Sequence, residues 1–162
     1  MNNSTNSSNS YHIYDGSNLY NIADKEGVII DYHPNGTRAI ELHHKNNKWH
    51  GVSKTWHDNE KLASCDEYYE GKLHGWSEGW YEDEKRHYKM MFVNGKHHGL
   101  YETWHRNGQI ECSKYFNDGL TDGIEKTWYE DGKPKSQVTF INGTTILYEF
   151  WHKNGVYERN AF

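Results

Sequence analysis

The chain has 162 residues, a formal net charge of −5 and a mean hydropathy of −1.12, with acidic and basic residues interspersed. Nucleic acids and anionic membranes bind clustered lysine and arginine, so this charge pattern argues against both as principal partners. Only 34% of the residues are hydrophobic, but 15% are aromatic, and Trp and Tyr each bury a large area. We therefore expect one thin folded domain in which aromatic side chains replace an aliphatic core.

The N-terminal region predicts a tail followed by a short hairpin. Residues 1–10, MNNSTNSSNS, lack the charged and apolar regions of a signal peptide, so we expect a flexible Asn/Ser-rich tail. Residues 11–26 predict a capping hairpin with its turn at Asp15-Gly16. No stretch approaches the roughly 18 apolar residues of a membrane span, and the chain is therefore expected to be intracellular and cytoplasmic.

A tryptophan recurs every 24 residues through the rest of the chain. The column consists of Trp56, Trp80, Trp104 and Trp128, with Tyr32 one period earlier and Trp151 23 residues later. The units begin at Gly27, Gly51, Gly75, Gly99 and Gly123, and a shortened sixth unit begins near Ile146. A fixed period of this length is typical of a repeat architecture.

Each unit predicts a strand, a tight turn, a second strand and a longer turn. Asn-Gly or Asp-Gly at the first turn, as at Asn107-Gly108, is a strong hairpin signal because both residues tolerate positive φ. Glu60 and Glu84 stand where this glycine is expected, so their turns should be slightly strained or of another type. The remaining turns carry glycines at Gly71, Gly95, Gly119 and Gly143.

The alternation of side chains along the strands predicts one aromatic face. In the fourth unit Leu100 and Trp104 have the parity of Cys112 and Phe116, and an odd-length connection would place all four together. We therefore predict a three-residue loop, a type I turn with a G1 bulge. The predicted face combines the Trp column with the second-strand aromatic residues Tyr68, Phe92, Phe116 and Phe140.

The predicted fold is all-β, a single-layer antiparallel ribbon of about six β-hairpin repeats. The repeat array covers residues 27–155, and residues 156–162 form a C-terminal cap. A lone hairpin is unstable in water, whereas stacked hairpins pair their strand edges and build continuous ladders of aromatic side chains.

Two segments carry a resemblance to a known family. Residues 69–75, YEGKLHG, and residues 93–99, VNGKHHG, resemble the core of the MORN repeat. The alternation with a Trp-x-x-Asn-Gly half is more similar to the variant MORN repeats of bacterial antitoxin-like proteins and of large DNA viruses. The resemblance covers most of residues 27–155, and it departs from the pattern at Glu60, Glu84, Asp122 and the 23-residue final step. It implies a non-catalytic module for protein interaction, scaffolding or dimerisation, with membrane or phospholipid contact in some relatives.

The remaining residues do not predict chemistry. Cys65 and Cys112 occupy different columns of the repeat, so we expect them on opposite faces and not in a disulfide. Equivalent histidines of adjacent units are two strands apart, about 10 Å, too far for one zinc ion. The chain lacks HExxH, GxSxG and phosphate-loop motifs. The sequence predicts no enzyme, no metal and no cofactor.

The hypothesis from sequence is a non-enzymatic interaction module that binds a protein partner, or a second copy of itself, through its aromatic face. The residues predicted to bind are Trp56, Trp80, Trp104, Trp128, Tyr68, Phe92 and Phe116. An antitoxin or immunity role and a virion assembly role belong to this class. The alternative from another class is a peripheral phospholipid-binding module, which requires Lys48, Lys72 and Lys96 to align on one exposed edge.

Overall fold

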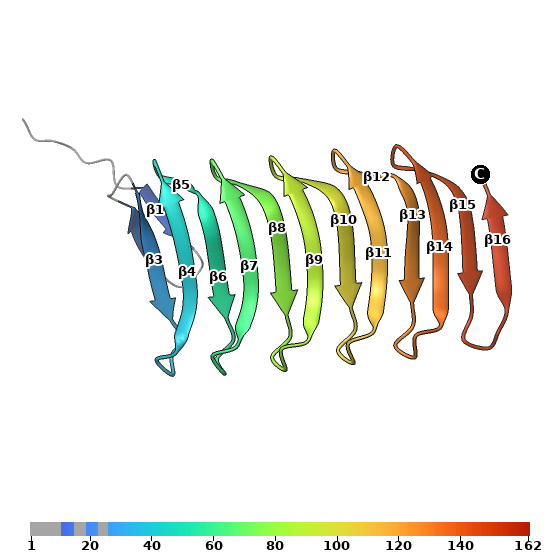
Figure 1. Cartoon of the computed structure of the whole chain (residues 1–162), viewed down its shortest axis with the longest axis horizontal. Helices are drawn as coiled ribbons and strands as arrows, with labels where there is room; N and C mark the ends of the chain where they lie inside the picture. The colour runs from blue at the N-terminus through green and yellow to red at the C-terminus, as the bar shows by residue number, and fades with distance from the viewer. Residues whose placement is uncertain (1–10, 15–18, 23–25) are drawn as a thin grey trace, which may run out of the picture.

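The fold is a single-layer antiparallel sheet, as the sequence predicts. The computed structural model describes residues 11–14, 19–22 and 26–162, and 14 strands of this part form one sheet in hairpin order (Figure 1). None of the described residues is helical, so none forms a helix long and apolar enough to cross a membrane. The tail predicted over residues 1–10 and the turn predicted at Asp15-Gly16 lie outside the described residues.

Two strands precede the main sheet. β1 (Tyr11–Tyr14) and β2 (Leu19–Ile22) pair with each other as a separate two-stranded sheet. The main sheet then consists of β3 (Glu26–Tyr32), β4 (Arg38–Lys45), β5 (Lys48–Trp49), β6 (Gly51–Trp56), β7 (Leu62–Tyr69), β8 (Lys72–Trp80), β9 (Arg86–Val93), β10 (Lys96–Trp104), β11 (Ile110–Asn117), β12 (Leu120–Thr121), β13 (Gly123–Trp128), β14 (Pro134–Ile141), β15 (Thr144–Trp151) and β16 (Tyr157–Ala161).

The long strands follow one another as neighbours from β3 to β16, with each strand antiparallel to the next. Each of the six Trp-slot residues ends the first strand of a hairpin, from Tyr32 at the end of β3 to Trp151 at the end of β15. The short strands β5 and β12 pair with β4 and β11. Figure 1 shows the resulting row of hairpins, with the turns gathered along two opposite edges.

The first turn of each unit is the predicted three-residue loop with a G1 bulge. In the fourth unit the Gly108 amide donates to the His105 carbonyl at 2.8 Å, and the His105 amide donates to the Gln109 carbonyl at 2.9 Å. Gly108 has a φ of 88°, the left-handed conformation this turn requires. Glu60 and Glu84 adopt the same conformation, each with a φ of 67°, so these turns are of the same type and carry the strain of a non-glycine residue.

The second turn of each unit was predicted to be longer than the first, and the structure shows that this prediction is wrong. Val93 pairs with Lys96, so that only Asn94 and Gly95 connect β9 to β10. Their φ angles of 52° and 82° are those of a two-residue type I′ turn, whose twist matches that of the flanking strands. The extra length that the sequence suggested instead lies inside the following strand, where Gly99 has a φ of 83° beside a shift in the β9–β10 register.

The prediction of one combined aromatic face is wrong. Thr103 pairs with Cys112 and Trp104 pairs with Ile110, which leaves Glu111 as an extra residue in β11. This bulge reverses the parity that the three-residue loop had set. Phe116 consequently pairs with Gly99 rather than with Leu100, and it lies on the opposite side of the sheet from Trp104.

The sheet therefore has two different aromatic faces. We call the side that carries Trp56, Trp80, Trp104 and Trp128 the Trp face. The other side is the Phe face, which carries Tyr68, Phe92, Phe116 and Phe140. The residues whose side chains are buried all lie on the Phe face, and they are His44, Ser53, Ser77, Phe92 and Val138. The core of the ribbon is therefore on the Phe face.

Candidate interaction faces

The Trp face exposes most of the apolar surface of the strands. Val28, Val52 and Ile124 are exposed at 49%, 41% and 48%, and each follows the first glycine of its unit. Trp76 and Leu100 occupy the same position in the third and fourth units and are half-buried. These five residues form an apolar row along one side of the Trp face, and the Trp column forms a second row along the other.

A row of mostly charged and polar residues, with Ile30 at its N-terminal end, separates the two apolar rows. Each member pairs directly with the next across the sheet. In strand order this charge row reads Ile30, Glu41, Lys54, Cys65, Glu78, Lys89, Glu102, Ser113, Lys126, Gln137, Glu149 and Arg159. Opposite charges on neighbouring strands are mutually favourable, which explains the alternation.

Basic side chains lie over several of the tryptophans. The Arg86 guanidinium is 5.4 Å from the Trp104 ring centre, and Arg38 is at the same distance from Trp56. The Lys89 ammonium lies 4.2 Å from the Trp76 ring and 3.2 Å from a Glu78 carboxylate oxygen. These cation–π contacts hold long side chains against the Trp face and leave its charged groups at fixed positions.

The Phe face is built around stacked aromatic rings. His97 lies between Phe92 and Phe116, with ring centres 4.3 Å and 4.8 Å away. Burial, and then the nearby Lys114 ammonium, lower the pKa of His97. Lys114 donates to Glu125 at 2.9 Å, and although burial opposes its charge, the Glu125 carboxylate outweighs that cost and the pKa of Lys114 is raised. This face uses its aromatic residues as core.

A polar cluster lies on the same face between the second and third units. Ser77 and Ser64 donate to the two carboxylate oxygens of Asp66 at 2.5 and 3.0 Å. The Ser64 hydroxyl also lies 2.9 Å from the Thr55 hydroxyl. Burial raises the pKa of the neighbouring Tyr88. The half-buried carboxylate is satisfied by hydroxyl groups of the sheet itself, as expected for a polar group with a structural role.

The histidines that follow the Trp column connect one unit to the next. The Nε2 atoms of His33, His57 and His105 lie 2.8–2.9 Å from the carbonyl oxygen of the tryptophan one unit later. Tyr81 and Tyr129 replace histidine in their units and donate from the hydroxyl group to the same kind of carbonyl. This column is therefore a ladder of hydrogen bonds. No cluster of metal-binding side chains occurs among residues 26–162.

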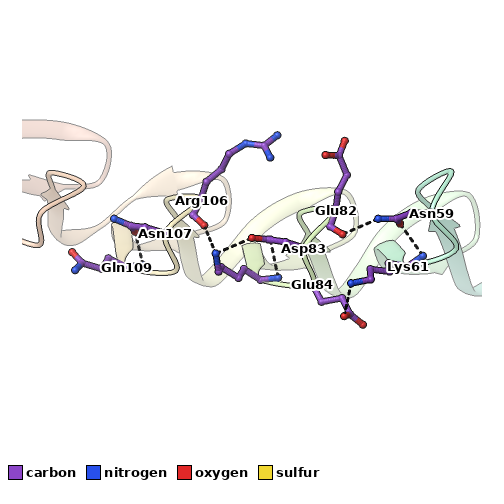
Figure 2. Close-up of polar contacts among 9 residues, drawn as sticks. Asn59, Lys61, Glu82, Asp83, Glu84, Arg106, Asn107 and Gln109 are labelled. Carbon is purple, nitrogen blue, oxygen red and sulfur yellow. Dashed lines mark hydrogen bonds and ion pairs between the residues drawn. The ribbon is translucent and has the colours of Figure 1, made fainter.

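The turn edge carries a second ladder (Figure 2). The Asn59 side chain donates to the Glu82 carbonyl at 2.9 Å, as Figure 2 shows. Asn107 donates to the Glu130 carbonyl in the same way. Where Asp83 replaces this asparagine, Lys85 reaches the Arg106 carbonyl at 3.1 Å instead. Units one to four therefore each fix the next unit through both backbone pairing and turn side chains.

The lysines of the alternative hypothesis do line up on the opposite edge. The aliphatic parts of Lys48, Lys72 and Lys96 pack against the turn glycine of the next unit. Lys48 pairs with Glu70 and Lys96 pairs with Asp118, each at 3.0 Å. Two of the three positive charges are therefore matched by adjacent carboxylates.

The cysteines lie on opposite faces, as predicted. Cys65 belongs to the charge row of the Trp face, and Cys112 pairs with Thr103 on the Phe face. Both thiols are free. Burial raises the pKa of Cys112 to about 11, so this thiol stays protonated and unreactive at neutral pH.

The geometry divides the predicted binding residues into two groups. The four tryptophans lie together on the Trp face and are half-buried, whereas Tyr68, Phe92 and Phe116 lie on the Phe face among core side chains. Comparison with known families then identifies the repeats. The model of the MORN repeat variant matches residues 25–46, 98–118 and 121–142, which contain the β3–β4, β10–β11 and β13–β14 hairpins apart from one or two end residues.

The chain is a MORN-type repeat protein. MORN repeats are generally modules for protein or membrane interaction and are generally not enzymes. None of the curated proteins compared with the chain matches it.

The sequence contained a signal for the residues that were missed. The apolar row of the Trp face repeats with the same 24-residue period as the tryptophans, from Val28 through Val52 to Ile124. Periodicity would have found this column. It would not have found the charge row, because that row depends on the register of every strand pair.

Proposed function

We propose that this MORN-type protein is a non-enzymatic protein-interaction module that binds its partner through the Trp face. The observation that carries the proposal is the asymmetry between the two faces. The buried side chains lie on the Phe face, and the exposed large apolar residues of the strands lie on the Trp face. Exposed apolar rows rimmed by charge are typical of protein-binding surfaces.

The binding mechanism is burial of the two apolar rows against a complementary surface. Aromatic side chains dominate the energy of such interfaces. In the Trp column, Arg38 and Arg86 lie over the rings of Trp56 and Trp104, and the hydrogen-bond ladder fixes the backbone carbonyls of the column. Little conformational freedom is then lost on binding. Antitoxin, immunity and assembly roles are all compatible with this mechanism, because each uses a rigid surface against a protein.

The test uses substitutions that change the Trp face without changing the core. Val52→Ser with Ile124→Ser replaces two exposed apolar side chains, and affinity capture from the source organism compares this variant with the wild-type chain. A partner that the wild type retains and the folded variant loses supports the proposal. A partner that binds both equally uses another surface and contradicts it.

The matched control changes two exposed apolar residues at positions remote from the apolar row. Val156→Ser with Phe162→Ser removes exposed apolar side chains, at 48% and 80%, from the last turn and from the C-terminal residue, both outside the strands of the Trp face. This control should retain the partner. Circular dichroism of both variants establishes that the sheet is intact.

A further inference from the structure

The charge row of the Trp face has an order that complements itself when it is reversed. The part of the row from Glu41 in β4 to Arg159 in β16 begins with a negative charge and ends with a positive one. Its central member is Glu102 in β10. Reversal about Glu102 places Glu41 opposite Arg159, Lys54 opposite Glu149, and Glu78 opposite Lys126. The neutral members Cys65 and Gln137 also meet each other.

We propose that the Trp face binds a second copy of this chain, with a two-fold axis that runs parallel to the strands through Glu102. The proposal rests on the proposed function, since it uses the same surface and names its partner. A two-fold interface pairs one patch with itself, so every favourable pair occurs twice. Only the two Glu102 carboxylates, on the axis itself, meet with the same sign.

The direction of the axis follows from the charges. An axis parallel to the strands reverses the charge row and keeps each apolar row opposite its own copy. An axis perpendicular to the strands, along the row, would place each charged residue opposite the same residue of the other copy. Like charges in contact are unfavourable throughout that arrangement, which excludes it.

The register follows from the same comparison. A shift by one strand, with the axis between Lys89 and Glu102, places Glu41 opposite Glu149. A shift in the other direction places Lys54 opposite Arg159 and Lys89 opposite Lys126. The register about Glu102 covers the strands from β4 to β16 and leaves β3 without a facing strand, whereas an axis between β9 and β10 would cover β3 as well, so charge complementarity and not contact length decides the register.

The flanking rows fit this arrangement. With the axis along β10, the Trp column of one copy faces the Trp column of the other, and Trp104 lies next to the axis. Packed sheets are about 10 Å apart, a distance that tryptophan and paired glutamate and lysine side chains bridge from two sides. Lys54, Glu102 and Lys126 form no ion pair among residues 26–162, so they are available to the second copy.

Sedimentation velocity on the full chain tests the proposal. At low salt the wild-type chain should form a dimer of twice 19.2 kDa, and higher salt should weaken it. Lys126→Glu places one carboxylate opposite Glu78 at each of the two symmetric positions. It should raise the dimer dissociation constant about tenfold or more. Its row neighbours Ser113 and Gln137 are uncharged, so the fold should tolerate the change.

Two further variants separate this geometry from a general effect of charge. Lys72→Glu makes the same change in net charge at the turn edge and should leave the dissociation constant unchanged. Glu102→Gln removes the like charges at the axis and should tighten the dimer roughly threefold, whereas Glu130→Gln in an exposed turn should not. Tightening by the loss of a surface carboxylate is a result that a merely structural role for Glu102 would not produce.

Two results would overturn the proposal. One is a wild-type chain that stays monomeric at its highest soluble concentration, and the other is a dimer that Lys126→Glu and Lys72→Glu affect equally. The proposed function fails separately. A monomeric chain whose partner still depends on Val52 and Ile124 keeps the proposed function and rejects self-association.

Discussion

Gly79 and Tyr88 are packed closely against each other in this thin sheet. Gly79 in β8 lies under the ring of Tyr88, and a Cβ atom built at Gly79 would overlap that ring. The aromatic ring covers the exposed backbone of the glycine, so the pair acts as one packing unit. The period of the repeat does not predict this contact, since the other units do not have Gly and Tyr at these two positions.

Gly79→Ala should therefore destabilise the protein by about 1–3 kcal/mol, the usual cost of overpacking. Urea denaturation measures the loss. In a Tyr88→Ala background the same substitution should cost less, because the ring that the new methyl group meets is gone. Equal costs in both backgrounds would show that the ring does not constrain Gly79.

His97 gives the stability of the Phe face a pH dependence. Burial and Lys114 lower its pKa, so the folded protein binds this proton less tightly than the unfolded chain does. Above the unfolded pKa of about 6.5, His97 is neutral in both states and its effect on the free energy of unfolding does not change with pH. The free energy of unfolding falls as the pH drops from there towards the folded pKa. Thermal midpoints measured between neutral pH and pH 5 should fall less steeply for His97→Phe than for the wild type.

At the scale of single elements, the first turn of each unit was predictable, whereas the second turn and the faces of the sheet were not. The Asn-Gly signal at Asn107-Gly108 determines a local conformation, and the three-residue loop follows from it. The face of Phe116 depends on the extra residue Glu111, which no local sequence signal marks. A single bulge moves every later side chain of the strand to the other side, so counting along the sequence assigned Phe92 and Phe116 to the wrong face.

The turn of the second unit provides a test of backbone strain. Glu60 has a φ of 67°, a conformation that glycine adopts without strain. Glu60→Gly should raise the free energy of unfolding by about 0.5 kcal/mol, since relief of strain exceeds the added flexibility of the unfolded chain. Asp58→Gly, two residues earlier in the same turn and outside the left-handed region, should lower it. Chemical denaturation of the two variants distinguishes the effects, and stabilisation of both would contradict this account.

Substitutions in the hydrogen-bond ladder along the Trp column test whether side chains connect the units. His105→Ala leaves the Trp128 carbonyl without its partner at 2.9 Å and should cost about 1 kcal/mol. His105→Tyr should retain most of the stability, because Tyr81 and Tyr129 fill the same role in other units. Among the described residues the His152 ring bonds only to the exposed Glu158 side chain, so His152→Ala should cost little by comparison. Similar losses for His105→Tyr and His105→Ala would contradict the ladder.

At the scale of the whole molecule, the sequence predicted the architecture because the period is a property of the entire chain. The 24-residue spacing of the tryptophans required six similar hairpins, and the sheet from β3 to β16 contains them. It did not predict which surface is exposed, since exposure depends on how the bulges distribute side chains between the faces. The charge row likewise becomes visible only when the register of all the strands is known.

Each unit of such a sheet contacts only its neighbours, so whole units should be removable. Deletion of residues 99–122 joins His98 to Gly123, which restores the His-Gly junction of the other units. Tyr81 then faces the Trp128 carbonyl in place of that of Trp104, and the turn ladder continues. We expect this variant to fold with the β-sheet circular dichroism of the full chain and with a smaller denaturant m-value, because less surface is exposed on unfolding.

A deletion of the same region out of phase supplies the control. Removal of residues 99–110 leaves half a unit. The remaining second strand would then have to run in the direction of a first strand, and the Trp column would lose its alignment. This variant should not fold, although fewer residues are removed. If it were as stable as the variant that lacks residues 99–122, then length rather than the period would determine the fold. If the deletion of residues 99–122 unfolded the protein, the units would be coupled beyond their nearest neighbours.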